Sequence, residues 1–95
     1  MVKITRLSGP TVRLNLTADD WRLYNADTPD QEQDRDFVAD VLNHRMELLI
    51  AGAPTRERFD FSSINLLLHG YSAWGAAETR TRDVCSLVLE EVYGR

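Results

Sequence analysis

The chain is predicted to be an α+β protein, a single small domain in which an N-terminal β-hairpin packs against three to four α-helices. The first sixteen residues alternate apolar and polar side chains around a turn, and the remainder shows helix caps followed by helical apolar spacing. The length of 95 residues, with 43% apolar and 27% charged residues, suits one globular domain. It excludes a disordered chain and large catalytic barrels.

Residues 2–16 are predicted to form the hairpin. The tripeptide Ser8-Gly9-Pro10 supplies the turn chemistry, and Val12, Leu14 and Leu16 alternate with polar residues in the second strand. A lone hairpin is marginal in water, so its apolar face is expected to lie against helices. The side chains expected to point outward are Lys3, Thr5, Arg13 and Asn15.

Four helices are predicted after the hairpin, over residues 17–25, 28–51, 61–75 and 78–93. Thr17, the capping box that starts at Thr28, and Asp60 or Ser62 are the expected N-caps, while Gly52, Gly75 and Gly94 are the expected stops. A strand over 84–93 is the competing interpretation, because apolar residues are dense there. The expected core-facing positions are Phe37, Val38, Val41, Leu42, Leu48, Leu49, Ile64, Leu67, Leu68, Tyr71, Trp74, Val84, Leu87, Val88 and Val92.

Charge is unevenly distributed along the chain. The net charge is −4, but residues 19–40 carry eight acids against two arginines, whereas residues 1–18 carry three basic residues and no acid. A concentrated acidic segment repels nucleic acid and attracts basic surfaces. The alternative is a solvated helix face that promotes solubility.

Catalytic and metal-binding constellations are weak. The sequence around Ser72 resembles the nucleophile elbow of α/β-hydrolases, but Trp74 stands where the elbow needs a small residue and no histidine follows the serine. The remaining zinc-type ligands, His44, His69 and Cys85, lack metal-site spacing. We therefore expect no enzymatic activity, no metal and no cofactor, and a buried, unreactive Cys85.

The expected function is stoichiometric protein–protein binding by a small cytoplasmic protein. The acidic segment would steer to and dock on a partner with a basic surface, with two aromatic residues as apolar anchors. By class-level analogy, such a domain is typical of inhibitors, immunity proteins and phage-encoded anti-defence proteins such as anti-CRISPRs. The residues expected to bind the partner are Asp19, Asp20, Trp21, Tyr24, Asp30, Asp34, Asp36 and Asp40.

Two other functions stay open. One is a homo-oligomeric structural or assembly module, possible as a homodimer, in which the hairpin edge or the helix face from Ile64 to Trp74 is covered by a second copy. The other is a nucleic-acid-contacting accessory protein, which the acidic net charge disfavours; its contacts would be Arg56, Arg58, Arg80 and Arg82. No apolar stretch approaches the roughly 18 residues of a membrane helix, so no membrane partner is expected.

Overall fold

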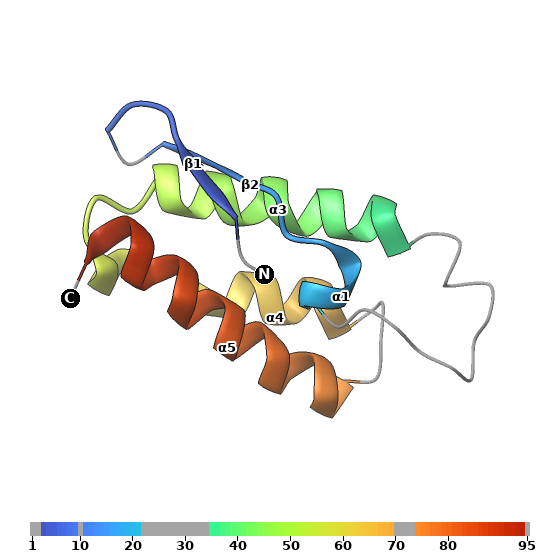
Figure 1. The fold of residues 1–95 in the computed structure, drawn as a ribbon. Helices are drawn as coiled ribbons and strands as arrows, with labels where there is room; N and C mark the ends of the chain where they lie inside the picture. The colour runs from blue at the N-terminus through green and yellow to red at the C-terminus, as the bar shows by residue number, and fades with distance from the viewer. Residues whose placement is uncertain (1–2, 10, 22–34, 70–73, 95) are drawn as a thin grey trace.

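The computed structural model confirms the α+β class, with an antiparallel hairpin at the N-terminus followed by helices (Figure 1). The structure describes residues 3–9, 11–21, 35–69 and 74–94, without the side chains of 67–69 and 74–81. Its elements are β1 (Ile4–Arg6), β2 (Val12–Leu14), α1 (Ala18–Trp21), α3 (Arg35–Ala51), the 3-10 turn η1 (Arg56–Arg58), α4 (Phe61–His69) and α5 (Trp74–Tyr93).

The hairpin follows the predicted strand pattern. β1 and β2 pair in antiparallel register with Thr5 opposite Arg13. Gly9 has φ of 56°, in the left-handed region that favours glycine, so the turn needs this residue. The alternation in the second strand is confirmed, because the residues between the apolar ones are exposed and the buried set is Val12, Leu14 and Leu16.

The helices form two layers under the hairpin. β2 packs on α3, α3 packs on α4, and α4 packs on α5 (Figure 1). The short helix α1 contacts both α3 and α5 and closes the space between them. Within the described residues, no helix combines the length and the apolar character needed to cross a bilayer.

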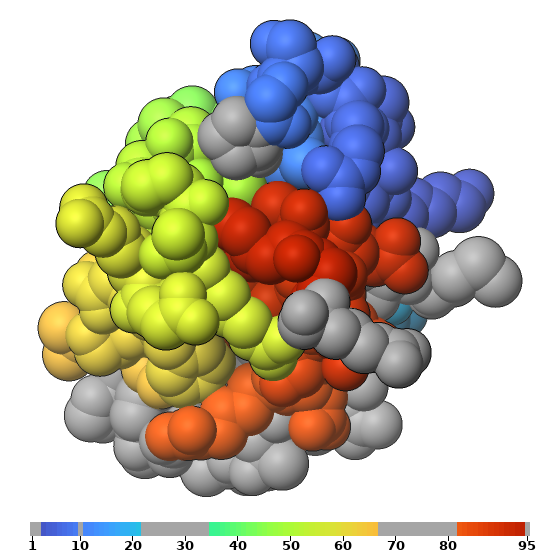
Figure 2. Space-filling model, turned by 90° about the vertical axis from the view of Figure 1, so that its left-hand side faces the viewer, coloured from blue at the N-terminus to red at the C-terminus, as the bar shows by residue number. Residues whose placement is uncertain are grey.

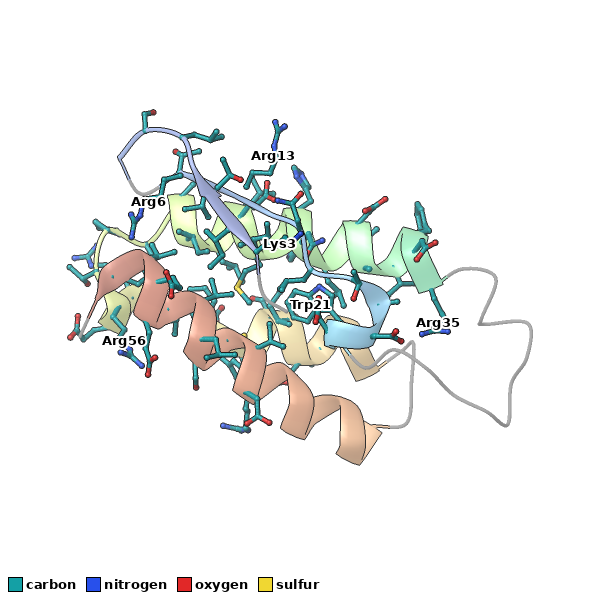
Figure 3. All side chains as sticks on the ribbon, in the orientation of Figure 1. Lys3, Arg6, Arg13, Trp21, Arg35 and Arg56 are labelled. Carbon is teal, nitrogen blue, oxygen red and sulfur yellow. The ribbon has the colours of Figure 1, made fainter. Side chains whose placement is uncertain are left out.

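Trp21 is the largest fully buried side chain of the core, with no exposed surface (Figure 3). α3 and α5 each contribute apolar side chains at helical spacing, which places one stripe of each helix against the core. The buried residues of these two helices are Val38, Ala39, Leu42, Asn43, Met46, Ile50, Val84, Cys85, Val88 and Val92.

Three side chains predicted to face the core are instead exposed, namely Phe37 (65%), Leu48 (52%) and Leu87 (47%). α3 is apolar on two sides, and the stripe that contains Leu42 and Met46 is the one covered by neighbouring elements. Leu87 lies off the i, i+4 row that α5 buries. The prediction for α3 is therefore right for Val38 and Leu42, which are buried, and wrong for Phe37 and Leu48.

Two helix boundaries also differ from the prediction. Gly75 was expected to end a helix, but α4 ends at His69 and Gly75 lies inside α5. Glycine in a helix costs only about 1 kcal/mol relative to alanine, which packing of the helix can offset. The strand interpretation of residues 84–93 is wrong, because this segment belongs to α5. The predicted capping box at Thr28 and the face positions Leu67, Leu68 and Tyr71 lie outside the described residues or side chains.

Other predicted helix ends are confirmed. The Asp60 carboxylate accepts the Ser62 N–H at 3.2 Å and the hydroxyls of Ser62 and Ser63 at 2.6 and 2.9 Å, so Asp60 caps α4. These hydrogen bonds, led by the one from the Ser62 side chain, lower the pKa of Asp60. Gly52 follows the last residue of α3, and its N–H donates to the Leu48 carbonyl at 3.0 Å.

Polar side chains fasten the end of the molecule where the hairpin, the end of α3 and the C-terminal turns of α5 meet (Figure 2). The Arg6 guanidinium donates to the carbonyls of Glu91 and Val92 in the last turn of α5. A cation at this position also interacts favourably with the helix dipole. The Tyr93 hydroxyl donates to the Ala53 carbonyl at 2.6 Å, which fixes α5 to the loop after α3.

Candidate functional site

A groove of about 310 Å³ lies between the segment that joins β2 to α1 and the first half of α3. Its lining is mixed, and the buried side chains that border it include Leu16, Ala39 and Asn43. Its rim is polar, with Asn15 and Thr17 on one side and two carboxylates of α3 on the other. The predicted acidic segment therefore contributes to a concave surface, which we call the acidic groove.

The two carboxylates are those of Asp36 and Asp40. They lie four residues apart, so they occupy one edge of α3 with Cβ atoms about 5–6 Å apart. Both side chains are exposed. Neither carboxylate has an ion-pair partner within the part of the chain that the structure describes. The groove therefore carries two negative charges that the described residues of its walls leave uncompensated.

Asp19, unlike Asp36 and Asp40, has an ion-pair partner among the described residues. Its carboxylate forms an ion pair with Arg35, which extends from the first turn of α3 to the level of α1 (Figure 3); the Arg35 Nη2 to Asp19 Oδ1 distance is 2.5 Å. The Asp19 side chain is 86% exposed, so solvent screens the pair and its contribution is below about 1 kcal/mol. The ion pair nevertheless offsets the charge of Asp19 toward a partner.

Asp20 has a local structural role. The Asp20 carboxylate accepts the Thr17 backbone N–H at 2.9 Å, while the Thr17 hydroxyl accepts the Asp20 N–H at 3.2 Å. This reciprocal pair is a capping box, and it confirms Thr17 as the N-cap of α1. Burial alone would raise the pKa of Asp20, but hydrogen bonds, including those from Thr17, lower it. We therefore leave Asp20, which is 6% exposed, out of the candidate surface.

Trp21 was predicted to be an apolar anchor for a partner, but the structure places it in the protein's own core. Its indole Nε1–H donates to Asn43 Oδ1 at 2.9 Å, and Asn43 Nδ2 donates to the Leu16 carbonyl at 2.9 Å. A small domain gains more from burying a large ring than from exposing it, which accounts for the correction. The remaining predicted binding residues, Tyr24, Asp30 and Asp34, lie outside the described residues.

Asn43 is the residue of the site that the sequence analysis missed. It is a buried polar side chain on the core stripe of α3, between Ala39 and Met46. Its two hydrogen bonds hold α1 and the segment before it against α3, and so they set the width of the acidic groove. An amide within an otherwise apolar stripe is the signal that would have identified it.

The hairpin edge that β2 presents is partly covered. The Leu14 N–H, which points away from β1, donates to the Glu47 carboxylate of α3 at 2.9 Å. This contact satisfies a backbone donor that a second copy would otherwise need to pair.

The residues proposed for other functions are also located. Arg56 and Arg58 are exposed on η1, and the Arg82 guanidinium lies 4.8 Å from the centre of the Phe61 ring, while the side chain of Arg80 is outside the described set. Arg56, Arg58 and Arg82 do not line the acidic groove. His44 is exposed on α3, as expected for a surface histidine.

Metal and nucleophile chemistry gain no support from the described residues. No group of three or more metal-type ligands occurs among them. Cys85 is 2% exposed, and burial raises the pKa of its thiol to about 12, an effect that nearby Arg82 only partly offsets. The predicted burial of Cys85 is confirmed. The segment around Ser72 lies outside the described residues.

Comparisons of the chain with protein-family models, with curated proteins and with solved structures found no match.

Proposed function

We propose that the protein acts by stoichiometric binding to another protein, and that the acidic groove receives a basic side chain of that partner. The observation that carries the proposal is the position of Asp36 and Asp40, which are exposed, one turn apart and on the rim of the same groove. A small inhibitor or anti-defence protein would use such a surface to occupy a basic site on its target.

The geometry favours an extended cation. Two carboxylates on one helix edge offer acceptors for a guanidinium or ammonium group, and charge-assisted hydrogen bonds are the stronger kind. The apolar residues in the lining, such as Leu16 and Ala39, offer contacts to the aliphatic stem of lysine or arginine. The volume of about 310 Å³ lies at the lower end of the range for ligand pockets, about 300–1,000 Å³, so it fits one long side chain.

The test begins with identification of the partner. The wild-type chain serves as bait in an extract of the native host, beside a groove variant, Asp36→Lys, and a matched control, Asp83→Lys. Asp83 is an exposed acid on α5, so both variants change the net charge from −4 to −2. A protein retained by the wild type and by D83K, but not by D36K, supports the proposal.

Association kinetics with the purified partner then test the mechanism. We expect the wild-type association rate to fall as salt rises, because steering between opposite charges is screened. We expect D36K to associate about tenfold more slowly with a weaker salt dependence, and D83K to resemble the wild type. Equal association of D36K and the wild type would exclude the groove as the docking site.

A further inference from the structure

α3 carries a second apolar stripe on the side away from the core. Phe37 and Leu48 are 65% and 52% exposed, and Val41 is half-buried. With His44 and Ala51, both exposed, these residues recur at spacings of four, three, four and three. This is the heptad spacing of the a and d positions in a coiled coil. We call this set the outer stripe of α3.

A groove of about 490 Å³ borders the outer stripe on the side of α4. It is lined by Val41, Arg45, Ser63 and Leu66, and Leu66 is 73% exposed. The apolar surface therefore extends from α3 onto α4. Side chains of this kind usually become buried when a partner is bound.

The charges beside the outer stripe indicate what that partner is. When Val41 and Leu48 are assigned to heptad position a, Asp40 falls at position g, just before Val41. Arg45 then falls at position e, four residues after Val41. Both side chains are exposed, and within the described residues neither has an ion-pair partner. In a parallel pair of helices, the g side chain of one lies beside the e side chain five residues later in the other.

A second copy of the chain therefore supplies a charge opposite to that of Asp40 and one opposite to that of Arg45. Asp40 of each protomer would meet Arg45 of its partner, because the two-fold axis repeats the contact. In an antiparallel pair, g positions face g positions and e positions face e positions, so Asp40 would not lie beside Arg45 and the complementary contact would be lost. The charge pattern thus favours the second copy and also its direction.

We propose that a second copy of this chain covers the outer stripe, with the two α3 helices parallel about a two-fold axis. The contact goes beyond the proposed function, because the acidic groove lies on a different side of α3 and only Asp40 borders both. Two heptads form a small interface, so we expect a dimer that dissociates on dilution in the micromolar range.

The decisive experiment is a charge swap followed by sedimentation velocity over a range of protein concentrations. We expect Asp40→Arg and Arg45→Asp each to weaken dimerisation by about tenfold or more, because like charges then face each other. We expect the double variant D40R/R45D to dimerise like the wild type, and an equimolar mixture of the two single variants to form heterodimers. Both positions are exposed, so folding is expected to survive and circular dichroism checks it.

Controls separate this proposal from the proposed function. Asp36→Lys should weaken partner docking and leave dimerisation unchanged, while Arg45→Asp should weaken dimerisation and leave docking at a single groove unchanged. A His44→Cys variant should form an intermolecular disulfide under mild oxidation, since d positions face each other in a parallel pair. A wild-type chain that stays monomeric at about 500 μM, or a dimer that R45D does not weaken, overturns the proposal.

Discussion

Replacement of Asn43 by leucine tests whether one buried amide holds the acidic groove together. In the wild type, Asn43 accepts the Trp21 indole N–H and donates to the Leu16 carbonyl, both at 2.9 Å. Leucine has the same branched arrangement of side-chain heavy atoms, although its two methyl groups are bulkier than the amide oxygen and nitrogen. The substitution deprives one buried donor and one buried acceptor of their partners.

The expected loss follows from these two groups. An unsatisfied buried polar group costs about 1–3 kcal/mol. Asn43 is 8% exposed, so water can reach the site in part, and the lower half of the range applies. We therefore expect the free energy of unfolding to fall by about 2–4 kcal/mol, which is a large fraction of the roughly 5–15 kcal/mol available to a small domain.

Urea unfolding followed by circular dichroism measures this loss, and a double-mutant cycle assigns it. Trp21→Phe removes the indole N–H and keeps most of the ring, so N43L should cost less in the W21F background, with a coupling energy of about 1 kcal/mol. A loss below about 0.5 kcal/mol for N43L, or effects that simply add, would refute the structural role of Asn43.

Two further predictions concern titrating groups. Burial raises the pKa of the Cys85 thiol to about 12, so alkylation by iodoacetamide at pH 8 should be at least about 100-fold slower in the folded protein than in urea; equal rates by mass spectrometry would contradict this. Because hydrogen bonds lower the pKa of Asp20 from 3.8, its carboxylate stabilises the fold above that pH and loses this effect as the pH falls through the native value. Asp20→Asn should therefore cost about 1 kcal/mol at pH 7, and the difference in unfolding free energy should shrink below about pH 4; a pH-independent difference would argue against the charge.

The hairpin and the C-terminal part of α5 could be predicted because each has a single apolar face. Val12 and Leu14 alternate with polar residues, and only one register buries both. Val84, Val88 and Val92 define one helical row in the same way. The local pattern and the tertiary packing agree at these positions, whereas the exposure of Leu87 and the choice of helix over strand came from the structure.

α3 was harder to predict because its sequence offers two apolar stripes. Phe37 and Leu48 are more hydrophobic than Ala39 and Asn43, yet the second pair is buried and the first pair is exposed. The choice depends on what β2, α1 and α4 can cover, which is long-range information that no local window contains. The error is informative, since the stripe wrongly assigned to the core is the surface now proposed to bind a second copy.

The acidic segment was recognised from charge alone, but charge did not show how each carboxylate is used. Asp20 caps α1 and Asp19 pairs with Arg35, whereas Asp36 and Asp40 remain available on the groove. A count of charges cannot separate these roles, because they depend on distances across different elements. Among the described carboxylates, the two that line the groove lie on one edge of α3, while Asp30 and Asp34 lie outside the described residues.

The two proposals together assign three separate sides to α3: a core side, a groove side and a side for the second copy. In a parallel pair, the two-fold axis runs along the helices, so the two acidic grooves face opposite directions at the same end of the dimer. Such a dimer engages either two partner molecules or two sites on one partner. In the second case, linkage raises the apparent affinity by about 10²–10⁴ without new contacts, and R45D would lose that gain while its intact groove retains the intrinsic affinity. D36K would lose the intrinsic affinity of each groove and, with it, the gain from linkage. The two variants therefore separate the affinity of a single groove from the gain in apparent affinity that two linked grooves provide.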